Sequence, residues 1–118
     1  MFGFEKEAIV QYNETQNMNI IHQLYIKYKN DKNFDKCWQY GTKLLTQLGG
    51  FNNPNKCTEI IHVIFRYKPT KITKEEQIKF LEQIVQIYPI PGTDFNQWKN
   101  FMGFVGFKYK ALTGKELF

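Results

Sequence analysis

The sequence predicts an all-α protein of about five helices, packed as antiparallel helical hairpins in a short solenoid-like stack. Apolar residues recur every three or four positions rather than every two, which is the period of a helix and not of a strand. Prolines, glycines and capping residues divide this pattern into segments joined by short connections, which favours antiparallel neighbours. At 118 residues the chain is one domain, 1–118, long enough to bury a core without a disulfide or a metal.

The N-terminal part of this domain is expected to be the least ordered. Residues 1–16 are predicted to be weakly structured, with some helical character over 4–12. The first firm helix is predicted over 17–28, because its apolar side chains form one stripe, and the polar residues 29–33 end it. That stripe consists of Ile20, Ile21, Leu24, Tyr25 and Tyr28.

Two further helices are predicted in the middle of the chain. One covers 35–48 and stops before Gly49-Gly50, a strong C-terminal signal. The next opens at Asn53-Pro54, an N-cap followed by proline at the first helical position, and it ends before Pro69. The two apolar faces consist of Trp38, Gly41, Leu44, Leu45 and Leu48 in the first helix, and of Cys57, Ile60, Ile61, Ile64 and Phe65 in the second.

The last two helices also have recognisable starts. Thr73 to Glu76 reads as a capping box, and the helix that follows is stopped by Pro89. Thr93 or Asp94 caps the final helix, which is apolar nearly all round and therefore not typical of a helix that faces water. The residues expected to form the core of the domain are Leu24, Trp38, Leu44, Leu48, Ile60, Ile64, Leu81 and Ile84.

Aromatic side chains are unusually abundant for a domain of this size. They make up 17% of the residues, more than so small an interior is expected to hide, and exposed aromatic surface is typical of protein interfaces. The rings predicted to contact a partner lie on the final helix: Trp98, Phe101, Phe104 and Phe107. Alanine at Trp98 and Phe101 is then expected to release the partner and to leave the helices intact. The alternative is that all four rings fold back onto the other helices.

The residue types that bind zinc are present but poorly spaced. They are His22, Cys37, Cys57 and His62. Structural zinc sites use pairs two to four residues apart, whereas Cys57 and His62 are five apart on one helix and diverge. We therefore predict no metal site and no cofactor. A disulfide between Cys37 and Cys57 remains an alternative to two small core thiols.

No catalytic residues can be identified. The chain contains no serine, its carboxylates lie mostly beside lysines as on a solvated surface, and it has no glycine-rich phosphate loop. Gly103 and Gly106 lie three apart in an aromatic helix, where close packing against a neighbour is the favoured reading. The sequence therefore predicts a protein that is not an enzyme.

The positive charge leaves a second class of function open. The net charge is +5, carried almost entirely by lysine, since Arg66 is the only arginine. Lysines interleaved with rings can grip single-stranded nucleic acid, so a small RNA-binding module is an alternative, although lysine is also a residue that AT-rich genomes favour. The stretch that motivates this alternative contains Lys27, Lys29, Lys32 and Lys36 with Tyr25, Tyr28 and Phe34.

The sequence gives little information on localisation. No stretch approaches about 20 consecutive apolar residues, so we expect no transmembrane span. The first ten residues resemble neither a secretory signal nor an Arg-rich transit peptide.

The order of features resembles one family of helical proteins. An aromatic helix is followed by Asn33-Phe34-Asp35 and by Trp38 early in the next helix. A turn over 49–53 leads to Pro54, and an Ile-Lys-Phe-Leu-Glu helix over 78–82 follows. An aromatic final helix and the exit Thr-Gly-Lys-Glu-Leu-Phe over 113–118 complete the series. Over 24–118 this is similar to the cytochrome c oxidase subunit Va family, called subunit VI in fungi.

The resemblance implies a function and a place in the cell. Members of that family are small helical-hairpin proteins on the matrix face of the mitochondrial oxidase, and they are accessory subunits without haem or copper. The chain would then be a non-catalytic subunit of respiratory complex IV that supports its assembly and stability, with other subunits as partners. The basic charge and the longer break before Thr73 depart from the family pattern. A helical scaffold subunit of another organellar or cytoskeletal complex is the alternative.

Overall fold

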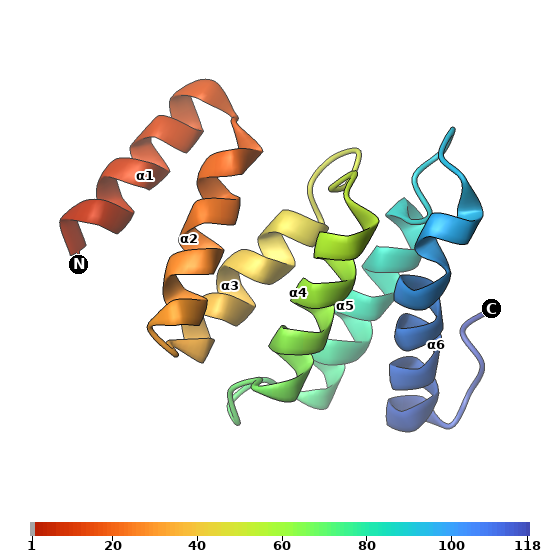
Figure 1. Ribbon diagram of the computed structural model, residues 1–118. Coiled ribbons are helices and arrows are strands. Elements are labelled where there is room, and N and C mark those ends of the chain that lie inside the picture. Colours follow the sequence, from red (N-terminus) through yellow and green to blue (C-terminus); the bar gives the residue numbers. More distant parts are fainter. Residues whose placement is uncertain (1) are drawn as a thin grey trace.

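The fold is all-α, as the sequence predicts. The computed structural model describes residues 2–118, with side chains from Phe4 onward, and these residues form six α-helices and one 3-10 turn, with no strand. The elements are α1 (Phe2–Thr15), α2 (Met18–Asn30), α3 (Phe34–Leu45), α4 (Pro54–Arg66), α5 (Lys74–Ile87), η1 (Phe95–Trp98) and α6 (Lys99–Thr113). Successive helices run in opposite directions, so the chain is a series of antiparallel hairpins (Figure 1).

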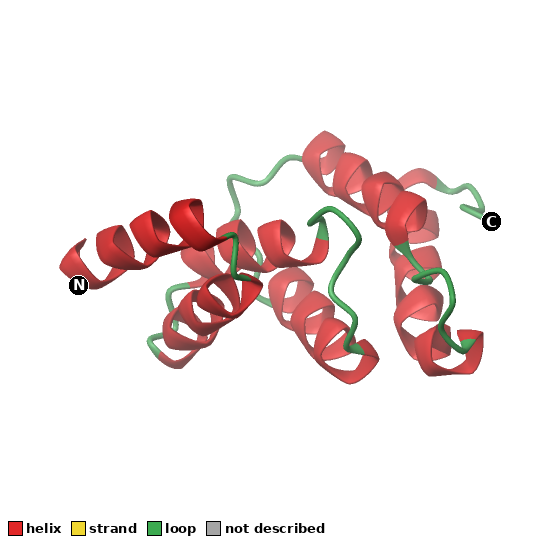
Figure 2. Cartoon of the chain, turned by 90° about the horizontal axis from the view of Figure 1, so that it is seen from above, coloured by secondary structure: helices red, strands yellow, loops and turns green. Residues whose placement is uncertain are grey.

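The hairpins form a row rather than a closed bundle. α2 packs against both α1 and α3, α3 packs against α4, and α6 lies against both α4 and α5. The two ends of the chain lie at opposite ends of this row, which measures 43 × 35 × 20 Å (Figure 2). Because α6 returns to α4, residues about forty positions apart in sequence line one surface there.

The predicted helix starts at Asn53 and Thr73 are confirmed, and two details differ from the prediction. The side chain of Asn53 accepts a hydrogen bond from the backbone N–H three residues on, at 3.1 Å. Thr73 caps α5 in the same way at 3.0 Å, but the Glu76 carboxylate accepts from the Thr73 hydroxyl instead of reaching back to its backbone, so only half of the capping box forms. Asp94 caps η1, and α6 itself begins only at Lys99.

The core contains seven of the eight predicted residues. The exception is Leu48, which is fully exposed. The prediction failed because α3 ends at Leu45, where Thr46 closes the last turn, so Leu48 lies beyond the helix and no longer follows its period. Side chains with less than 2% exposure include Ile21, Leu24, Tyr25, Leu44, Leu45, Ile60, Ile61, Ile64, Leu81 and Ile84.

The N-terminal segment, for which the sequence predicts weak structure with some helical character, forms a helix over its described residues. α1 is a regular helix of 14 residues, although its sequence has only a weak apolar stripe. Contacts with later helices hold it instead: the Tyr12 ring is buried, its hydroxyl accepts a hydrogen bond from the Gln47 amide at 2.8 Å, and the Lys43 ammonium lies 5.2 Å from the ring centroid. Such contacts join residues more than thirty positions apart, so no local sequence pattern predicts them.

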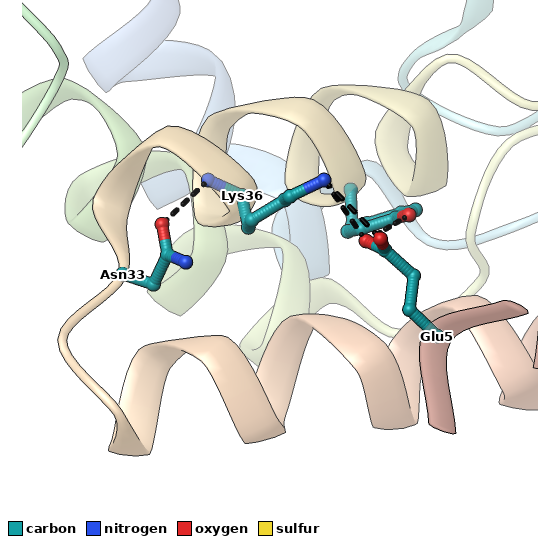
Figure 3. Close-up of polar contacts among 4 residues, drawn as sticks. Glu5, Asn33 and Lys36 are labelled. Atoms are coloured by element: carbon teal, nitrogen blue, oxygen red, sulfur yellow. Dashed lines mark hydrogen bonds and ion pairs between the residues drawn. The ribbon is translucent and has the colours of Figure 1, made fainter. Parts of the chain in front are cut away.

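A polar network fastens the other end of α1 to α3 (Figure 3). The Glu5 carboxylate accepts a hydrogen bond from the Tyr40 hydroxyl at 2.7 Å and pairs with the Lys36 ammonium at 3.0 Å. The Tyr40 hydrogen bond, and after it Lys36, lowers the pKa of Glu5 against the opposing effect of burial. Asn33 caps α3 by accepting from the backbone N–H of Lys36, which holds this lysine in place.

This network predicts a pH-dependent contribution to stability. Because the folded-state pKa of Glu5 is lowered, its contribution is complete above the unfolded pKa of about 4.5 and is lost as pH falls through the folded pKa. We expect Glu5→Gln to cost about 0.5–1 kcal/mol at pH 7, since Lys36 is partly screened by solvent. Urea unfolding at pH 7 and pH 3 measures this, and a difference between the two proteins that stays constant over that range contradicts it.

Candidate interaction surface

Two of the four rings predicted to face a partner lie in the core. Trp98 and Phe101 are 0% exposed, so the prediction of partner contact is wrong for both. Their rings meet edge to face with centroids 5.7 Å apart, and each lies 5.0 Å from the ring of Tyr88. The indole N–H of Trp98 donates to the Thr93 hydroxyl at 2.9 Å, so its polar atom is satisfied as well.

Tyr88 packs against both buried rings, Trp98 and Phe101, and is itself held in place by two hydrogen bonds. Its hydroxyl donates to the carbonyl oxygen of Leu45 at 2.8 Å and accepts from the backbone N–H of Phe51 at 2.8 Å. These bonds tie the end of α5 to the end of α3 and to the loop before α4. The fixed Tyr88 ring then provides the surface on which Trp98 and Phe101 pack.

The other two rings lie at the surface of α6. Phe107 is 68% exposed, and Phe104 is partly exposed. Gly103 and Ala111, also exposed, lie one turn before and one turn after Phe107, on the same side of the helix. A Cβ atom added at Gly103 would meet no other atom within 4 Å. We call Gly103, Phe107 and Ala111 the outer face of α6, with Phe104 at its edge.

A recess lies beside the outer face, between α4 and α6. It has a volume of about 420 Å³, and it is lined by His62, Val63, Arg66, Tyr67, Phe104 and Lys108. The rings of His62 and Phe104 form one wall, with centroids 4.1 Å apart. Phe104 in turn lies 6.0 Å from the core ring of Phe65, which fixes its position. The recess therefore combines an aromatic wall with basic side chains.

The electrostatics of the recess are one-sided. Among the described residues, none that lines it is acidic, and its two permanent cations lie over rings rather than beside carboxylates. The Lys108 ammonium is 5.7 Å from the Phe104 centroid, and the Arg66 guanidinium is 5.3 Å from the Tyr67 centroid. Within residues 4–118, no carboxylate pairs with either cation. Glu59, one turn before His62, is engaged by Lys29 at 2.8 Å.

The basic stretch over 27–36 is organised differently. Lys27 pairs with Asp31 at 3.6 Å, Lys29 with Glu59 at 2.8 Å, and Lys36 with Glu5 at 3.0 Å. The rings that motivated the nucleic-acid alternative are also engaged within the chain: Tyr25 and Tyr28 are buried, and Phe34 stacks on Tyr67 with centroids 4.5 Å apart. Three of the four lysines of this stretch are thus paired with carboxylates, and its three rings are buried or stacked within the chain.

The two cysteines are free and buried, which resolves the open question of a disulfide. Burial raises the pKa of the Cys37 thiol to about 11 and that of the Cys57 thiol to about 12. Both are therefore protonated and unreactive at neutral pH. Among the described residues, no three His, Cys, Asp or Glu side chains gather as metal ligands would.

The sequence interpretation missed the recess. His62 was considered only as a metal ligand, and Arg66 only as part of the total charge. A signal was present, because His62 and Arg66, like Phe104 and Lys108, are spaced four apart and so share a helix face. What could not be predicted is that the two faces meet, because this depends on the return of α6 to α4.

Comparisons with known proteins identify no relative of this chain. No family model, no curated protein and no solved structure matches the chain. None of the described helices combines the length and apolar character needed to cross a bilayer. The surface of α6 and the recess beside it are therefore the features from which a function can be argued.

Proposed function

We propose that the chain is a non-catalytic accessory subunit of a larger protein assembly and that it docks through the outer face of α6. The observation that carries the proposal is the exposure of the Phe107 ring, 68%, between the small residues Gly103 and Ala111. A large ring flanked by small side chains gives a neighbouring helix both an apolar anchor and room for close approach. The partly exposed Phe104 extends this apolar surface toward α4.

The assembly that we propose is the mitochondrial cytochrome c oxidase, with the chain on the matrix face of the inner membrane. The proposed assembly and location are supported by the order of sequence features described above, together with the helical-hairpin architecture that the resemblance implies. The chain would bind neither haem nor copper, and it would support the assembly and stability of the oxidase. The RNA-binding alternative is less favoured, because the lysines of the stretch 27–36 that motivated it are largely paired with carboxylates.

Affinity purification tests both parts of the proposal. A tagged full-length chain, expressed in the cells from which it comes, is expected to recover the subunits of the haem–copper oxidase, identified by mass spectrometry. Phe107→Ser is expected to lower this recovery by at least about tenfold, as for loss of a central interface anchor. Phe95→Ser is the matched control, because Phe95 is also exposed, at 56%, but lies in η1 beyond the other end of α6.

The two parts can fail separately. Recovery of a different, constant set of subunits replaces the oxidase by another complex, while the docking surface remains valid if Phe107→Ser still abolishes recovery. Equal recovery with Phe107→Ser and Phe95→Ser contradicts the docking surface. A chain that recovers no partner and remains a dispersed monomer contradicts the subunit proposal as a whole.

A further inference from the structure

We propose that the recess between α4 and α6 binds an acidic segment of a partner protein, with an aromatic side chain of that segment inserted against Phe104 and His62. This inference rests on the proposed function, because it specifies the chemistry of a partner for an accessory subunit. It concerns a different surface from the outer face of α6, and it is tested without knowing the assembly.

The shape of the recess suits one large side chain. Its volume of about 420 Å³ is in the range of about 300–1,000 Å³ found for binding pockets. The wall formed by His62 and Phe104 is tilted by 36° between the two rings, so an incoming ring can contact one face and the edge of the other. Val63 completes an apolar lining that an aromatic or large aliphatic side chain would cover.

The charge of the recess selects an acidic partner. Arg66 and Lys108 contribute two permanent positive charges, and no lining residue is acidic. Both cations rest over aromatic rings, which holds them in place without neutralising them. A guanidinium in this state can bind a carboxylate through two parallel hydrogen bonds, and Arg66 is the only arginine of the chain.

A protein segment fits this recess better than a nucleic acid does. Binding of a single strand uses a track of cations with several free ring faces along it. Here the recess offers two cations and one ring pair, and the next ring, Tyr67, is already stacked on Phe34 at 4.5 Å. Phe104 also borders the outer face of α6, so a protein docked there could place a segment in the recess.

The probe for this test is a fluorescently labelled random copolymer of glutamate and tyrosine, which samples many acidic–aromatic sequences at once. Fluorescence anisotropy with the full-length chain at about 150 mM salt limits unspecific attraction, because exposed charges are then screened beyond roughly 8 Å. We expect saturable binding that is at least about tenfold weaker for the double variant Arg66→Glu/Lys108→Glu, since both charges of the site are reversed.

The matched control is Lys74→Glu/Lys99→Glu. Two reversals of two charge units each take the net charge from +5 to +1 in both double variants, so unspecific attraction changes equally. Lys74 and Lys99 are exposed and begin α5 and α6, where glutamate is favoured by the helix dipole, so the fold is retained. Binding by this control is expected to stay within about twofold of the unmodified chain, as for charges outside an interface.

A third variant and one further polymer, polyglutamate, test the aromatic part. Phe104→Leu keeps apolar contact with the core but removes the ring, and it is expected to erase the preference for the glutamate–tyrosine copolymer over polyglutamate. Circular dichroism melting curves establish that each variant is folded. Equal weakening by both double variants, no preference over polyglutamate in the unmodified chain, or absence of binding overturns the proposal.

Tighter binding of polyuridylate than of the copolymer also overturns the proposal, and it favours the RNA-binding alternative. The result of the copolymer-binding experiment does not depend on the result of the affinity purification described above. Copolymer binding with no oxidase recovered removes the proposed assembly and leaves the recess. If the oxidase is recovered but the copolymer does not bind, the proposed assembly stands and the proposal for the recess is wrong.

Discussion

Replacing Trp98 by alanine is expected to lower the free energy of unfolding by about 3–5 kcal/mol, the usual cost of removing a large ring from a well-packed core. Trp98 is 0% exposed and packs between Tyr88 and Phe101, so its removal leaves a cavity at the end of α6. The indole N–H that donates to Thr93 is lost as well. A loss of this size is a large part of the 5–15 kcal/mol that stabilises a typical domain.

Urea unfolding of the isolated full-length chain, followed by circular dichroism, measures this effect. The control is Phe107→Ala in α6, the helix that begins directly after Trp98, and it is expected to change the free energy of unfolding by less than about 0.5 kcal/mol, because the ring is largely exposed. A Trp98→Ala protein as stable as the Phe107→Ala protein would show that the Trp98 ring is not part of the core. The expectation from sequence, that alanine at Trp98 and Phe101 leaves the helices intact, is replaced by this one.

The contrast between these two rings shows where sequence reasoning succeeds and fails. Periodicity places Trp98 and Phe107 on one helix, and the capping residues place the start of that helix within a few positions. Periodicity does not say which side of a helix that is apolar all round will be covered. Tyr88 covers one side, and it is held there by a hydrogen bond from the loop before α4, so the covering depends on contacts between distant parts of the chain.

The same distinction explains the other successes and failures. Asn53 and Thr73 could be predicted as caps because a cap is a local hydrogen bond, over three residues. The order in α1 could not be predicted, because it depends on Glu5 and Tyr12 meeting residues of α3 and of the loop that follows. Leu48 was misplaced by extending the period of α3 beyond its end at Leu45.

The candidate surface combines both kinds of information. The outer face of α6 was predicted in part from the sequence, since Phe104 and Phe107 were expected at an interface and both are at least partly exposed. The recess was not visible, because neither Arg66 on α4 nor Lys108 on α6 signals a site by itself. Only the packing of α6 against α4 brings to one place an aromatic wall and two cations that pair with no carboxylate in the part of the chain that the structure describes.

Gly41 is a position within a helix where added volume is expected to be strongly destabilising. It lies where α3 packs on α4: a Cβ atom there would come within 2.8 Å of Ile64 Cγ2 and 3.2 Å of Ile60 Cγ2. Both isoleucines are 1% exposed, and their branched side chains are stiff, so neither can turn aside. We expect Gly41→Leu to separate α3 from α4 and to lower the free energy of unfolding by about 3 kcal/mol or more.

Gly103→Leu is the matched control, because it makes the same change within another helix where an added Cβ meets nothing within 4 Å. Leucine has a higher helix propensity than glycine, so this control is expected to gain roughly 0.5–1 kcal/mol. Urea unfolding of the isolated chain should therefore move the two variants in opposite directions. Equal stability of the two would mean that α3 and α4 are not in close contact at Gly41.

If the outer face of α6 is the docking surface, Gly103→Leu should also lose its partners while gaining stability, because the new side chain fills the space beside Phe107.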